Sequence, residues 1–316
     1  MSEFLVVLRH VTKIYKTHER ALLPGLGDLF EKAKDVDSFR ALFSKSNIFQ
    51  AYQGIRETFE AKREEFFHKD SLTERAKFLR ELVFKEDELA VSALLDISTE
   101  FESGEFAAIA GPSGSGKSTL LNIVGSLEEP TFGQVIFEGR NLEEIREDDR
   151  AEFRRRNLGF IFQAFNLIPV LSAFENVEYA LILKGVPGDL RRSRTREALR
   201  YVGLEDCMHR RPVRLSGGQQ QRVAIARALA VDPKLILADE PTANLDSKTA
   251  VAILDLMEKI NRDKGTTFIF SSHDSMILSR ARRVISLRDG AIVGIDHKKT
   301  GSVPGIETPP LGRPAA

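Results

Sequence analysis

The N-terminal part of the chain carries two different patterns of apolar and polar positions. Residues 4–11 are mostly large or β-branched apolar residues, which predicts a β-strand. Residues 18–89 are highly charged and place apolar side chains at the spacing of one face of an amphipathic helix, most clearly at Ile48, Tyr52, Ile55, Phe59 and Phe66. A capping box from Ser71 to Glu74 opens a further helix. We therefore expect 18–89 to form a mostly helical module of about three helices.

Beyond residue 90 the chain alternates between short apolar runs and helical patterns. The runs at 106–110, 235–238 and 268–271 have the length and composition of buried strands. Because helical patterns lie between them, we expect an α/β fold, with a parallel sheet covered by helices on both faces. Residues 296–316 contain four prolines and three glycines with little apolar material, so this tail is expected to be disordered.

Composition narrows the class of protein. Among the 316 residues, 46 Lys and Arg balance 46 Asp and Glu. A protein that coats nucleic acid needs a surplus of cations, so we expect no nucleic-acid partner. The single cysteine, Cys207, excludes a disulfide framework. No apolar run approaches the roughly 18 residues of a membrane-spanning helix. We therefore expect a cytoplasmic protein that reaches the membrane only through a partner.

A phosphate-binding motif follows the apolar run at 106–110. It has the form G-x-x-x-x-G-K-[ST] and leads into an apolar helix start, which is the context that a P-loop requires. Glycines allow successive backbone N–H groups to point at an anion, and the helix dipole adds to the attraction. The lysine can reach the outer phosphates and the serine after it can bind Mg²⁺. The candidate ATP-binding residues are Gly111, Pro112, Ser113, Gly114, Ser115, Gly116, Lys117, Ser118 and Thr119.

Two carboxylates and a histidine follow the other two predicted strands. Asp239 and Glu240 end the run at 235–238, where parallel strands face a ligand crevice. Asp239 suits Mg²⁺, whereas Glu240 can deprotonate a water for attack on the γ-phosphate. His273 follows the run at 268–271 and can contact the γ-phosphate and that water. A P-loop alone shows only that a nucleoside triphosphate binds, because many enzyme classes share it.

A third motif makes the class more specific. Residues 215–222 read Leu-Ser-Gly-Gly-Gln-Gln-Gln-Arg and open a predicted helix. The free N–H groups of this helix start and the Ser216 hydroxyl offer a second anion site. Together with the P-loop, Asp239-Glu240 and His273, this motif makes the chain resemble the ATP-binding cassette (ABC) ATPases over about 1–17 and 90–295. Residues 158–163, 166–169, 175–177 and 240–249 resemble more narrowly the group that serves lipoprotein release and macrolide export.

The resemblance implies a fold, a partner and further site residues. The expected fold is an ABC-type P-loop NTPase with a helical signature subdomain and, here, an inserted helical module. Two chains would pair head-to-tail, so that each signature caps the other chain's ATP. The in-trans residues would be Ser216, Gly217, Gly218, Gln219 and Asp246. Tyr15 matches the aromatic that stacks on adenine, and Gln163 matches the glutamine that touches Mg²⁺. Ser118, Gln163 and Asp239 would hold Mg²⁺, with Glu240 and His273 as the catalytic pair.

Three features of the sequence depart from the relatives' pattern. Ala243 replaces the usual glycine, Val213-Arg214 stands where relatives often carry an acidic residue, and 18–89 replaces a short hairpin.

Two functions are compatible with these motifs. The leading hypothesis is an ATPase subunit that drives separately encoded membrane permease subunits from the cytoplasmic face. The alternative is a soluble ABC ATPase in a non-transport assembly or repair process. The sequence names no cargo.

Overall fold

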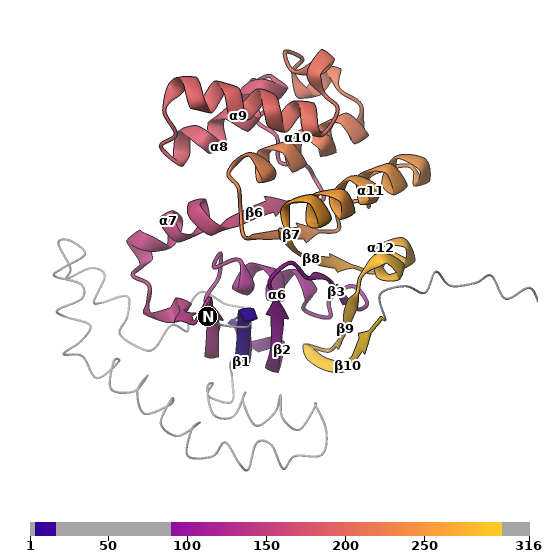
Figure 1. The fold of residues 1–316 in the computed structure, drawn as a ribbon. Helices are drawn as coiled ribbons and strands as arrows, with labels where there is room; N and C mark the ends of the chain where they lie inside the picture. Colours follow the sequence, from indigo (N-terminus) through magenta and orange to yellow (C-terminus); the bar gives the residue numbers. More distant parts are fainter. Residues whose placement is uncertain (1–3, 17–89, 299–316) are drawn as a thin grey trace, which may run out of the picture.

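A computed structural model of the chain describes residues 4–16 and 90–298. It contains two β-sheets and a group of helices (Figure 1), so the predicted α/β class is confirmed. The predicted helical module at 18–89 lies outside the described residues, as does the tail from 299 onward. Within the described residues, no helix combines the length and the apolar character needed to cross a membrane.

The larger sheet has six strands in the order β10-β9-β3-β8-β7-β6. Strands β9, β3, β8, β7 and β6 run parallel, and β10 pairs antiparallel with β9 at one edge. All three predicted strands are present in it. The bounds are β3 (Phe106–Ala110), β6 (Leu158–Ile161), β7 (Leu235–Asp239), β8 (Thr267–Ser272), β9 (Arg283–Arg288) and β10 (Ala291–His297). Strand β10 includes residues 296 and 297, so the strand ends two residues beyond the boundary expected for the tail.

The smaller sheet is antiparallel, in the order β2-β1-β4-β5. Strand β1 extends to Lys16 and is longer than the predicted 4–11. Lys16 pairs with Ala90, so the two ends of the undescribed segment 17–89 leave from adjacent positions of one ladder. The bounds are β1 (Phe4–Lys16), β2 (Ala90–Glu102), β4 (Phe132–Phe137) and β5 (Arg140–Asn141).

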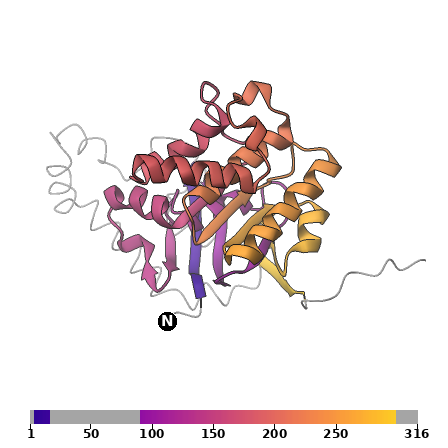
Figure 2. The same ribbon diagram turned by 45° about the horizontal axis from the view of Figure 1, so that its top comes forward.

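The helices fall into two groups. Helices α8, α9 and α10 pack on one another and lie together at the top of the molecule (Figure 1 and Figure 2). Helix α6 packs instead on β2, β7 and β8, while α10 also contacts β6 and α11. The bounds are α6 (Lys117–Val124), α7 (Glu147–Asn157), α8 (Ala173–Leu183), α9 (Gly188–Tyr201), α10 (Gly217–Ala230), α11 (Ser247–Lys264) and α12 (Ser275–Arg280), with short 3-10 turns at Leu142–Glu144, Glu205–Cys207 and Pro212–Arg214.

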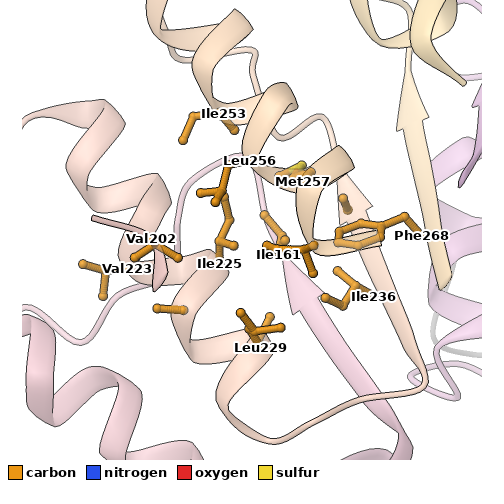
Figure 3. Packing of buried hydrophobic residues seen from close by; sticks show 14 of the residues in the cluster. Ile161, Val202, Val223, Ile225, Leu229, Ile236, Ile253, Leu256, Met257 and Phe268 are labelled. Atoms are coloured by element: carbon orange, nitrogen blue, oxygen red, sulfur yellow. The ribbon is translucent and has the colours of Figure 1, made fainter. Parts of the chain in front are cut away.

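Alternating side chains of the central strands divide the core between the two faces of the larger sheet. Phe268 and Phe270 of β8 pack on one face with residues of α10 and α11, as Figure 3 shows in part. Ile269 points to the other face, where it meets residues of the smaller sheet and α6. This alternation is the two-residue period of a strand buried on both faces. The core therefore fixes the carboxyl ends of β3, β7 and β8 rigidly against one another.

Candidate nucleotide site

The loop between β3 and α6 curls around the Lys117 ammonium. Lys117 is buried, and its Nζ donates to the carbonyl oxygens of Gly111 at 2.9 Å and Pro112 at 2.8 Å. The turn depends on glycine at 116, which has a φ of 99° and packs so closely that a Cβ there would lie 2.4 Å from Ala93 O. A side chain at this position would clash with backbone as well as strain the turn. The motif predicted from sequence therefore forms a compact loop at the start of a helix.

Hydroxyl and carboxylate oxygens converge next to this loop. Ser118 Oγ donates to Asp239 Oδ1 at 3.1 Å, and the hydroxyl of Ser271 donates to the same oxygen. Mg²⁺ prefers hard oxygen ligands and completes its shell with phosphates and water. The described residues hold no group of three or more His, Cys, Asp or Glu that could hold a metal ion without further ligands. The donor set at the end of β7 thus fits Mg²⁺ bound together with a nucleotide.

Glu240 and His273 form a hydrogen-bonded pair beside that carboxylate. His273 Nδ1 lies 3.0 Å from Glu240 Oε1. Glu240 adopts a left-handed backbone conformation with a φ of 42°, and its N–H donates to Ser271 O at 3.0 Å. This conformation is strained for a residue other than glycine, so surrounding contacts must hold it. The carboxylate of Glu240 and the imidazole of His273 are therefore held next to each other at the cost of backbone strain.

Tyr15 is the second-last residue of β1 and lies close to the first turn of α6. Its hydroxyl donates to Glu128 Oε2 at 2.5 Å, and Lys13 Nζ lies 5.2 Å from the centre of its ring. Burial and the bond to Glu128 raise the pKa of Tyr15, while a hydrogen bond with Thr119 opposes them. The ring thus lies next to the helix that the phosphate loop opens, and it remains about one third exposed. A partly exposed aromatic in this position can receive a base by stacking.

The signature segment begins α10 with a capping box. Ser216 Oγ accepts from Gln219 N at 3.3 Å, and Gln219 Oε1 accepts from Ser216 N at 3.0 Å. The hydroxyl hydrogen of Ser216 is still available to a ligand, because the cap uses the oxygen as an acceptor. Ser216 is exposed, so this helix start faces solvent. Helix α10 and the phosphate-loop helix α6 thus offer two separate anion-binding ends.

Comparison with known proteins shows which family shares this arrangement. The family model described as "ABC transporter" matches residues 94–243. An uncharacterized ABC transporter ATP-binding protein of Thermotoga maritima is 49% identical over 211 residues, which cover 67% of this chain and 90% of that protein. This chain belongs to the ABC transporter ATP-binding family. It is an ATPase of the ABC type.

Other ABC relatives differ in how much of their length is matched. The macrolide export ATP-binding/permease protein MacB of Rhodopseudomonas palustris is 48% identical over 210 residues, which cover 66% of this chain and 32% of that protein. The ATP-binding protein MJ0796 of Methanocaldococcus jannaschii is 46% identical over 213 residues, 66% of this chain and 91% of its own length. A solved dimeric structure of the MJ0796 cassette bound to ADP and Pi aligns with a TM-score of 0.67 at 34% identity, over 93% of this chain and 99% of that one. The ABC-type fold expected from the motifs is confirmed.

Two further candidate residues of this ABC cassette lie on loops that contact each other. Gln163 follows β6 with its side chain exposed, and its carbonyl accepts from Asn244 Nδ2 at 2.9 Å. Asp246 caps α11 by accepting from Thr249 N at 3.0 Å. Hydrogen bonds from Thr249 hold the pKa of the Asp246 carboxyl below its usual value. The loop after β6 and the loop before α11 are therefore linked in this chain.

Several contacts at the ABC site were not evident from sequence. Glu128 contacts Tyr15 across 113 residues, and Ser271 contacts Asp239 across 32. Arg227 is partly buried, burial lowers its pKa, and it donates to the carbonyls of Phe165 and Asn166. No local spacing marks such residues, because their partners come from distant strands and helices. Only their residue types, a carboxylate, a hydroxyl and a cation, were visible beforehand.

Proposed function

We propose that this chain is the ATP-binding and ATP-hydrolysing subunit that dimerises and powers a separately encoded membrane permease of the lipoprotein-release or macrolide-export type. The observation that carries the ATPase half is the convergence of Ser118, Asp239 and the Glu240–His273 pair at the carboxyl ends of β7 and β8. Ser118 lies 121 residues before Asp239, yet the two meet next to the phosphate loop. This convergence supports the proposal that these side chains act together on one nucleotide.

The proposed chemistry is in-line attack of water on the γ-phosphate of ATP. Glu240 takes a proton from the water as the water oxygen bonds to phosphorus and ADP leaves. His273 orients Glu240 through the 3.0 Å contact and is placed to touch the γ-phosphate. Lys117, buried in its loop, exchanges its carbonyl partners for phosphate oxygens. Ser118, Gln163 and Asp239 would hold Mg²⁺, which neutralises phosphate charge when bound.

The proposed dimer is head-to-tail. Ser216, Gly217, Gly218, Gln219 and Asp246 of one chain would cover the ATP bound to the P-loop of the other. Support comes from the exposed, capped start of α10, whose free N–H groups can bind a second anion. A two-fold arrangement gives each helix start a phosphate from the partner and makes both sites equivalent. A solved structure of the related MJ0796 cassette is dimeric.

The proposed permease contact is an apolar groove bordered by arginines. A cavity of about 300 Å³ lies between α7, β6, α8 and α10, and the segment from Phe162 to Asn166 forms part of its wall. Its lining is mostly apolar, with Arg154, Arg155 and Arg227 around it. Tyr179 and Leu183 of α8 are exposed one turn apart. This combination suits a cytoplasmic helix of a permease with an apolar face and acidic residues, beside the loop that carries Gln163.

Copurification and reconstitution test the permease half. A tagged chain purified from membranes is expected to bring down an integral membrane protein. In vesicles that protein should stimulate ATP hydrolysis several-fold. Leu183→Asp should lose most of the stimulation while basal hydrolysis stays, because it puts a carboxylate on the groove wall. Leu190→Asp is the matched control, since Leu190 is equally exposed on α9 but does not line the groove.

The opposite outcome would favour the alternative function. If no integral membrane protein copurifies, or if stimulation is the same for both variants, the groove is not a permease contact. Copurification with a soluble assembly would then indicate a non-transport ABC ATPase. With a permease identified, the chain acts at the cytoplasmic face of the membrane.

A further inference from the structure

A buried glutamine joins the signature helix to the loop that carries the candidate general base. Gln221 lies on α10, five residues after Ser216, and is completely buried. Its Nε2 donates to Pro241 O at 2.7 Å, and Pro241 follows Glu240 directly. At 1.5 Å per residue, Gln221 stands about 7.5 Å along the helix from Ser216. One short helical segment thus touches solvent at its capped end and the Glu240 loop at its buried end.

This glutamine is not what packing alone would require. Its Oε1 is buried and has no hydrogen-bond partner among the described residues. A buried acceptor without a partner costs stability, and an apolar residue of the same shape would remove that cost. The favourable part of the interaction is the single bond to the Pro241 carbonyl. The amide therefore acts chiefly by fixing that carbonyl.

The carbonyl in question belongs to a strained segment. Glu240 has a φ of 42°, which the backbone keeps only if neighbouring contacts hold it. Those contacts are Glu240 N to Ser271 O at 3.0 Å, Ala243 N to Glu240 O at 3.2 Å, and the bond from Gln221 to Pro241. The first two join the loop to β8 and to itself. Gln221 supplies the connection to the signature helix.

We propose that Gln221 is a positioning residue that sets Glu240 of its own chain according to the position of α10. The inference rests on the proposed function, in which Ser216 at the start of α10 touches the partner's ATP. Closure of the partner's ATP on Ser216 then holds α10, and Gln221 holds the Glu240 backbone at the angle needed for attack. Occupancy of one site then raises the rate of hydrolysis in the other through a contact inside a single chain.

The test compares ATP binding, turnover and stability in Gln221→Met. Methionine has a similar shape but cannot donate to Pro241 O. We expect kcat to fall about 10- to 100-fold, the loss that misplacement of a catalytic group by about 1 Å produces. KM for ATP and the midpoint of thermal unfolding should stay close to those of the wild type. Size-exclusion chromatography should show an ATP-bound dimer accumulating, because closure occurs and hydrolysis lags.

A structural control and a catalytic reference make the outcomes distinct. Asn261→Leu removes another buried amide, whose Nδ2 donates to Gly104 O and Thr266 O far from the loop, and it should lower stability without a selective loss of kcat. Turnover of Gln221→Met within twofold of the wild type would overturn the inference. A loss of turnover matched by losses of ATP affinity and thermal stability would also overturn it. If Glu240→Gln itself hydrolyses normally, the proposed function fails instead, which separates the two.

Discussion

At residue 240 the chain combines a carboxylate, a left-handed backbone and a histidine partner. The Glu240 side chain is about one fifth exposed, whereas the His273 side chain is about two thirds exposed. The carboxylate is therefore held by the fold, while the imidazole borders the space where a nucleotide would lie. In the proposed mechanism Glu240 is the base and His273 makes the orienting contact.

Glu240→Gln should bind ATP nearly as the wild type does, yet hydrolyse it about 10²–10⁴-fold more slowly. The amide keeps the size of the side chain but cannot accept the proton of the attacking water. Fluorescent nucleotide binding and phosphate release measure the two quantities separately. Near-normal phosphate release by the purified variant would remove Glu240 from the role of base.

At this scale, sequence reasoning identifies candidate residues where the motif is local, and their roles stay predictions. The P-loop, Asp239-Glu240 and His273 are contiguous motifs next to apolar runs, so their positions could be predicted. Glu128 and Gln221 could not be predicted, because each acts on a residue 20 or more positions away. The role of Gln221 depends on its burial. Of the three consecutive glutamines at 219–221, the one that is buried depends on which face of α10 meets the loop that contains Pro241.

At the scale of elements, the buried side chain of Arg283 links the two sheets. Arg283 at the start of β9 places its Nε 2.8 Å from Glu105 Oε1, and both side chains are only about one tenth exposed. Arg283 also donates to Glu100 O at the end of β2 and lies 5.0 Å from the centre of the Phe101 ring. Burial raises the pKa of Glu105, although Arg283 opposes the shift. Arg283 of β9 thus contacts β2 of the smaller sheet, and its charge is paired with Glu105 between β2 and β3.

Glu105→Ala should lower the free energy of unfolding by about 3–5 kcal/mol, because it leaves the Arg283 guanidinium buried without its carboxylate. Urea unfolding followed by circular dichroism measures the change. Glu205→Ala is the control, since its pair with Arg200 at 2.8 Å is exposed and should contribute little. Equal effects of the two substitutions would contradict the role given to the buried pair.

A strand could be predicted where its apolar residues form a continuous run. Strands β3, β7 and β8 are buried on both faces, so their sequences are short continuous apolar runs and were found. Strand β1 was predicted too short, because Thr12, Lys13 and Tyr15 interrupt its apolar pattern. The antiparallel ladder with β2 compensates for those polar residues by backbone pairing through Lys16. Such pairing across more than 70 residues has no local sequence signal.

For the whole molecule, the two points to which the segment 17–89 is attached, Lys16 and Ala90, are paired in one ladder. Antiparallel neighbours in one ladder can be joined by a tight turn, so the cassette does not need the intervening residues to close its sheet. Removing this segment distinguishes an appendage from a docking element for a partner. Their own arrangement lies outside the described residues.

Replacing residues 20–88 with a short Gly/Ser turn should leave ATP affinity, basal hydrolysis and the unfolding midpoint of the cassette unchanged. Isothermal titration, phosphate release and calorimetry measure these three quantities. Lost permease stimulation with intact basal hydrolysis would identify the segment as a docking element. A cassette that no longer folds would contradict the conclusion that the ladder closes without it.

The central claim is that each ATP is hydrolysed between the P-loop of one chain and the signature of another. Lys117→Ala damages only the P-loop, and Ser216→Arg damages only the signature. A mixed dimer of the two contains one site with both parts intact. Hydrolysis is therefore measured for each variant alone and for an equimolar mixture, after calorimetry has shown that both fold. The account predicts that each variant alone is nearly inactive and that the mixture hydrolyses ATP well above either variant. The rate stays below that of the wild type, because the chain with the intact P-loop has no partner ATP to hold its α10. A mixture as inactive as its components would contradict the composite site.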